Sequence, residues 1–81
     1  MDSKINKETG MKYAIKKHDE YFMVLRKLPF LEYLEYYTGR REEIEIIDQE
    51  PWLQLSKFDS YQAALMFEES LSNTIVNTLA V

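Results

Sequence analysis

The chain has 81 residues, a length that fits one domain, and its formal net charge is −4. It contains no cysteine, which excludes a disulfide framework, a thiolate zinc site and a cysteine nucleophile. Hydrophobic residues make up 46% of the chain, which is enough for a core. No stretch reaches the roughly 18 consecutive apolar residues of a membrane span, and the polar N-terminus lacks the apolar run of a signal peptide. We therefore expect a soluble, cytoplasmic protein.

Charge is distributed unevenly along the chain. Residues 1–41 hold nine Lys and Arg against six Asp and Glu, whereas residues 42–81 hold one lysine against eight acids. Such asymmetry indicates an interaction surface, or two solvated faces that happen to differ.

Residues 1–10 are polar and predict a flexible N-terminal arm, followed by a single domain over residues 11–81. Residues 11–17 alternate, with Met11, Tyr13 and Ile15 on one face and Lys12, Ala14 and Lys16 on the other. A short polar break at residues 18–20 is followed by the β-prone stretch 21–27. The pattern predicts a β-hairpin over residues 11–27, with Lys12, Lys16 and Arg26 on its more polar face.

The stretch 28–37 fits either a short helix or a strand. Pro29 suits the first position of a helix, and Gly39 suits its end. A helix would place Phe30, Tyr33, Leu34 and Tyr37 on one face, with Glu32 and Glu35 on another. A strand fits less well because the alternation is poor, so a short helix is favoured.

Two short strands are predicted next. Residues 38–43 form a charged turn, and the isoleucine-rich stretch 44–48 is β-prone. Residues 49–51, which include Pro51, break that strand. Residues 52–57 then form a further strand that leads to a helix.

The start of the last helix carries agreeing local signals. Asp59 or Ser60 caps the first turn, Gln62 has the capping-box spacing from Asp59, and Phe58 precedes the cap as a hydrophobic staple. Apolar positions at Tyr61, Ala64, Phe67, Leu71 and Ile75 follow helical spacing. We expect a helix over about residues 60–72, which the apolar tail 73–81 either continues or leaves. The summed expectation is an α+β fold, in which a small antiparallel sheet of a hairpin and one or two further strands packs against a C-terminal helix.

The residues that carry chemistry do not form a catalytic pattern. The two glycines do not form a phosphate-binding loop, and the acidic run lacks the spacing of a calcium loop. His18 is the single histidine and lies in the predicted hairpin turn beside Asp19 and Glu20, where a solvated role is expected. We therefore expect a protein that is not an enzyme and has no cofactor or metal.

Two features indicate protein binding. Six of the eleven aromatic residues lie in residues 21–37. They either fill the core or form an interface patch, because tyrosine and phenylalanine are enriched at binding hot spots and so short a chain cannot bury all eleven rings fully. The acidic run offers a charged edge for a basic surface, and such an interaction would weaken with salt. The predicted partner-binding residues are Tyr33, Tyr36, Tyr37, Glu42, Glu43, Glu45 and Asp48.

Two alternatives remain. Lys12, Lys16 and Arg26 with the nearby tyrosines could bind single-stranded nucleic acid, because bases stack on aromatic rings while lysines neutralise phosphates. The overall acidity of the chain counts against this function. Alternatively, the chain self-associates as a structural subunit through Ile75, Val76 and Leu79 of the apolar tail.

The order of these signals resembles small phage and mobile-element proteins. The residues that carry the resemblance are the hairpin stretches Lys12–Lys16 and Tyr21–Lys27, then Trp52, then the helix start Phe58–Ala64. The chain departs from the simplest pattern by an insertion of roughly residues 29–50. These proteins have mostly unassigned function, so the resemblance implies no active residues. For a chain of phage or mobile-element origin we expect a modulator or inhibitor of a host protein or defence complex.

Overall fold

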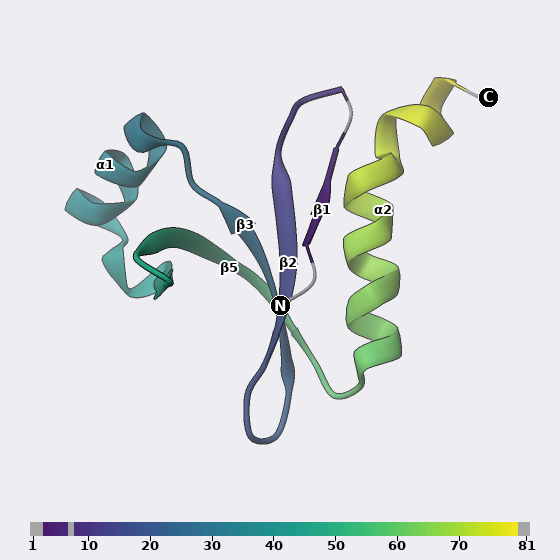
Figure 1. The fold of residues 1–81 in the computed structure, drawn as a ribbon, viewed down its shortest axis with the longest axis horizontal. Coiled ribbons are helices and arrows are strands. Elements are labelled where there is room, and N and C mark those ends of the chain that lie inside the picture. The colour runs from purple at the N-terminus through teal and green to yellow at the C-terminus, as the bar shows by residue number, and fades with distance from the viewer. Residues whose placement is uncertain (1–2, 7, 80–81) are drawn as a thin grey trace.

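The computed structural model describes residues 3–6 and 8–79, with side-chain surroundings up to Leu71. Five antiparallel strands form one sheet in the order β1-β2-β3-β5-β4, accompanied by two α-helices (Figure 1). The elements are β1 (Ser3–Ile5), β2 (Lys12–Lys17), β3 (Phe22–Lys27), α1 (Phe30–Gly39), the 3-10 turn η1 (Arg41–Glu43), β4 (Ile44–Ile47), β5 (Glu50–Phe58) and α2 (Tyr61–Leu79). This arrangement confirms the predicted α+β class, with the C-terminal helix packed against the sheet.

The predicted hairpin is present as β2 and β3. Tyr13 pairs with Arg26, so these two side chains share a sheet face, because directly opposed residues of antiparallel strands point the same way. Arg26 therefore lies on the face opposite to Lys12 and Lys16, and the expected grouping of these three basic residues on one face is wrong. Burial along β2 does not alternate as predicted, because Tyr13 and Ala14, on opposite faces of the strand, are both buried.

Part of the predicted N-terminal arm adds a strand to the sheet. β1 pairs with β2, and the Lys4 ammonium lies 3.0 Å from the Glu69 carboxylate of α2. The buried Asn6 side chain donates to the carbonyl of Leu71 at 2.9 Å and accepts from the N–H groups of Glu8 and Thr9. These bonds tie the residues after β1 to α2 and shape the turn that leads into β2.

A two-residue turn joins β4 to β5. Asp48 and Gln49 have φ values of 51° and 66°, the positive-φ pair that a tight hairpin with right-handed strand twist requires. The predicted break over residues 49–51 is therefore shifted, because Pro51 already belongs to β5. Proline is tolerated near the start of a strand, and the Pro51 carbonyl accepts from the N–H of Leu28 at 3.1 Å.

One sheet face closes on itself. Its core is a buried cluster of Ala14, Met23, Leu25 and Trp52, with Tyr21 and Ile47 packed against it. On the same face, the Lys16 ammonium of β2 lies 2.5 Å from the Glu45 carboxylate of β4. Strands β3 and β5 separate these two strands, which in a flat sheet would lie about 14 Å apart. We conclude that the sheet curls, as the bent paths of β3 and β5 in Figure 1 show.

Helix α2 covers the other face. It contacts β1, β2, β3 and β5. Ser60 accepts from the N–H of Ala63 at 3.2 Å, so the cap predicted at Asp59 or Ser60 is Ser60. Ala64 is fully buried, and the Phe67 ring lies 5.3 Å from that of Phe58. The helix continues to Leu79, while the side chains of Ile75, Val76 and Leu79 lie outside those the structure describes.

Candidate docking surface on helix α1

Helix α1 turns its apolar side away from the protein. None of its residues is buried. Phe30 is 71% exposed, Leu31 76%, Leu34 43% and Tyr37 45%. These four residues follow one another along a single helix face, because residues three and four apart are neighbours on an α-helix. The helix is confirmed where the sequence left helix or strand open. Its exposed face differs from the expected one, because it includes Leu31 and not Tyr33, which is half-buried.

The polar side of α1 holds it to the sheet. The Arg26 guanidinium of β3 donates to the Glu32 carboxylate at 2.8 Å, and the same nitrogen lies 3.4 Å from the Met11 sulfur. Just before the helix, Leu28 is buried and its N–H is bonded to Pro51. The start of α1 is therefore fixed in direction by an ion pair and a buried leucine, while the apolar face is left to solvent.

Two arginines cover the end of α1. The Arg40 guanidinium lies 4.8 Å from the centre of the Tyr36 ring, and that of Arg41 lies 4.4 Å from the Tyr37 ring. Arg40 also donates to both carboxylate oxygens of Glu43. This contact lowers the pKa of the Glu43 carboxyl and raises the pKa of Arg40.

The predicted partner-binding residues fall into two groups. Tyr33, Tyr36 and Tyr37 lie on α1, and Glu42 and Glu43 follow in η1, so these five belong to one end of the molecule. Figure 1 shows α1 well separated from α2, on the other side of β2 and β3.

The other two predicted residues have roles within the fold. Glu45 is half-buried on the curled sheet face, where it pairs with Lys16, and His18 Nε2 lies 3.8 Å from it. Asp48 occupies the positive-φ turn between β4 and β5. The structure therefore does not bring the acidic run together as one edge.

Sequence reasoning did not select Phe30, Leu31 and Leu34 as binding residues, although Phe30 and Leu31 are the most exposed apolar side chains of this region. The sequence did contain a signal for the orientation of this helix. Arg26 precedes the turn at Leu28–Pro29 by two residues, and Glu32 lies on the polar side of the helix that follows. An ion pair between them turns the opposite, apolar side outward.

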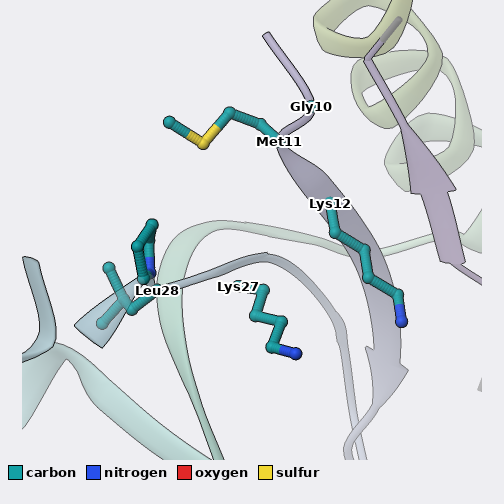
Figure 2. Close-up of a pocket in the computed structure, with 6 residues that line it drawn as sticks. Gly10, Met11, Lys12, Lys27 and Leu28 are labelled. Atoms are coloured by element: carbon teal, nitrogen blue, oxygen red, sulfur yellow. The ribbon is translucent and has the colours of Figure 1, made fainter.

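A hollow of about 240 Å³ lies at the base of α1. Its lining residues are Gly10, Met11, Lys12, Lys27, Leu28 and Pro29, and Figure 2 shows the two lysine side chains next to this hollow. Lys27 pairs with Glu50 at 2.7 Å and lowers the pKa of the Glu50 carboxyl. The hollow thus has an apolar side formed by Met11, Leu28 and Pro29, and a lysine rim.

Among the described side chains, no group of three His, Asp or Glu could hold a metal ion. The His18 ring stacks on Tyr21 at 4.7 Å. In the same part of the chain, neither helix combines the length and apolar character needed to cross a membrane.

Comparison of the chain with protein-family models, curated proteins and solved structures finds no match.

Proposed function

We propose that the protein is a small non-catalytic protein-binding module that docks through the apolar face of α1, formed by Phe30, Leu31, Leu34 and Tyr37. The observation that carries the proposal is that α1 buries none of its residues while it presents four large apolar side chains to solvent.

The size of this face supports a binding role. An aromatic side chain offers about 150–250 Å² and a leucine less, so the exposed fractions of the four together present roughly 400 Å². That area is within the range of about 300–600 Å² for the largest apolar patch on a typical monomer, which is often functional. In this chain of 81 residues, the whole of that apolar area lies on a single helix, α1.

The geometry fits one established mode of recognition. An amphipathic helix that lies in an apolar groove uses anchors at positions i, i+4 and i+7. Phe30, Leu34 and Tyr37 have this spacing. The ion pair of Glu32 with Arg26 holds the helix in place, so less ordering is needed on binding.

The nucleic-acid alternative has less support. Two of its three basic residues are engaged within the fold, Lys16 with Glu45 and Arg26 with Glu32. Phosphate binding would have to compete with these ion pairs. The narrower expectation of a phage or mobile-element modulator remains a prediction.

The test is site-specific photo-crosslinking in the source cell. A photoreactive amino acid replaces Leu31 on α1 in one variant and Met66, 64% exposed on α2, in the matched control. We expect a discrete covalent adduct with a protein from position 31 and none of that mass from position 66. The adduct should disappear when Phe30→Ser and Leu34→Ser are added. Identical adducts from both positions, or none from position 31, would contradict the proposal.

A further inference from the structure

We infer that the protein that docks on α1 has an apolar groove with a carboxylate at the end that meets Tyr37, and that this carboxylate pairs with Arg41. This inference rests on the proposed function, because it names the chemistry of the occupant of the same apolar face.

Arg41 is held at the C-terminal end of that face. Its guanidinium lies 4.4 Å from the centre of the Tyr37 ring, and its Nε donates to the Tyr37 carbonyl at 3.2 Å. The Tyr37 ring in turn contacts that of Tyr33, with the two ring centres 5.7 Å apart. An arginine ordered in this way loses little conformational freedom when it binds a carboxylate.

The neighbouring Arg40 shows what Arg41 lacks. Arg40 also stacks on a tyrosine, 4.8 Å from the centre of the Tyr36 ring, and it donates through two nitrogens to the two carboxylate oxygens of Glu43. Within the described part of the chain, Arg41 makes the ring contact and the carbonyl bond but no ion pair. Its terminal nitrogens are therefore open to the planar, bidentate contact that a guanidinium makes with a carboxylate.

The acids nearest to Arg41 are placed elsewhere. Glu43 is bonded to the neighbouring arginine. Glu42 lines a hollow over β5, so it lies on the side of η1 toward the sheet. Glu35 precedes Tyr37 by two residues, a spacing that does not place two side chains on the same side of a helix. The carboxylate that completes Arg41 therefore has to come from the partner.

The surrounding charges favour one placed carboxylate over a uniformly anionic surface. Glu35 and Glu42 are exposed, and neither forms an ion pair among the described residues. Anionic lipid head groups would repel both of these carboxylates while they attract Arg41. A protein groove can present a single carboxylate to Arg41 and leave the two glutamates in solvent, so a protein fits this surface better than a membrane does.

The apolar area indicates a transient complex. The four exposed side chains present roughly 400 Å², so the area buried on both partners stays below about 1,200 Å², the size range of weak and transient encounters. Arginine and tyrosine are enriched among the residues that carry most of the energy of an interface. The ordered pair of Arg41 and Tyr37 is thus the feature that selects the partner.

The first experiment measures the yield of the photo-crosslink from position 31 at a concentration that does not saturate the partner. Arg41→Gln should lower this yield about fivefold at low salt and by less at high salt, because exposed charges are screened. Arg40→Gln is the matched control, since it removes an arginine that also stacks on a tyrosine but has its carboxylate within the chain. It should change the yield less than twofold.

The second experiment identifies the carboxylate. A carbodiimide joins an amine and a carboxylate that are in contact as an amide, so the full chain with Arg41→Lys is treated with this reagent in an extract of the source cell. We expect a linkage from position 41 to an Asp or Glu of the same protein that position 31 crosslinks. The linkage should be lost when Leu34→Ser is added, and Met66→Lys, at an exposed position of α2, should not form it.

The outcomes separate this inference from the proposed function. If position 31 gives its adduct while Arg41→Gln leaves the yield unchanged, the inference is overturned and the proposed function stands. A linkage from position 41 only to carboxylates of this chain, in the same or a second copy, also overturns the inference. So does flotation of the full chain with vesicles of anionic phospholipid that Leu34→Ser abolishes, because the apolar face then meets a membrane surface. If position 31 gives no specific adduct, both fail.

Discussion

The two helices of this protein have similar sequence patterns and opposite environments. Helix α2 places Ala64 against the sheet and packs Phe67 on Phe58. Helix α1 has no buried residue, and Phe30 at its start is 71% exposed. Both carry apolar residues at helical spacing, so periodicity alone does not separate a helix that completes the core from one that offers a surface.

The difference arises from the segments that lead into each helix. A short capped turn at Ser60 directs α2 back across the sheet face that carries Phe22 and Phe58. Before α1, the buried Leu28 and the Arg26–Glu32 ion pair hold the polar side toward the sheet. The other sheet face is closed by its own curl, which leaves α1 no core to cover.

The largest expected difference is between the matched substitutions Phe67→Ala and Phe30→Ala. Phe67→Ala removes the contact with Phe58 beneath α2 and should lower the free energy of unfolding by about 2–3 kcal/mol. Phe30→Ala removes an exposed ring and should stay within about 0.5 kcal/mol of the wild type. Urea unfolding followed by circular dichroism measures both. Equal losses would show that α1 packs against the monomer after all.

A smaller effect is expected where α1 is attached. Glu32→Gln removes the ion pair with the largely buried Arg26 and should cost about 1 kcal/mol. Hydrogen exchange should accelerate in residues 30–39 and not in α2, because the lost contact belongs to α1. Glu35→Gln, at an exposed acid of the same helix, is the control and should change neither quantity. Uniform acceleration in both helices would mean that α1 is not a separately attached element.

Local signals account for what the sequence predicted well. The hairpin of β2 and β3 and the start of α2 follow from alternation and from a capping residue, which depend on neighbours in the chain. The curl of the sheet does not follow from such local signals. Ala14 lies between Lys12 and Lys16 on a face that alternation marks as polar, yet it is fully buried with Trp52, which is distant in the sequence.

The same limit applies to the candidate site. Sequence reasoning named Tyr33, Tyr36 and Tyr37 because aromatic residues cluster there, and all three lie on α1, the helix that we propose as the docking surface. Sequence reasoning also selected the acidic run, on composition alone. Within that run, Glu45 points inward and pairs with Lys16. Which face of α1 is exposed depends on Arg26 meeting Glu32, a contact between two elements.

The smallest expected effect concerns the end of α1. Arg40 lowers the pKa of the Glu43 carboxyl below its ordinary value of 4.5, so the charged form is favoured in the folded state. The resulting stability is present in full above pH 4.5 and is lost as the pH falls through the folded-state pKa. Glu43→Gln should therefore lower the midpoint of thermal unfolding slightly at neutral pH, and the difference should vanish once the pH is below the folded-state pKa of Glu43.

Glu42→Gln is the matched control for this last prediction. Glu42 is an exposed neighbour in η1, and within the described part of the chain it makes no ion pair. Its substitution should give a much smaller pH-dependent difference, because its charge makes only the weakest contribution to the raised pKa of Arg40. Added salt should reduce the effect of Glu43→Gln because exposed charges are screened. A difference for Glu43→Gln that persists in acid would mean that this carboxylate stabilises the end of α1 by packing and not by its charge.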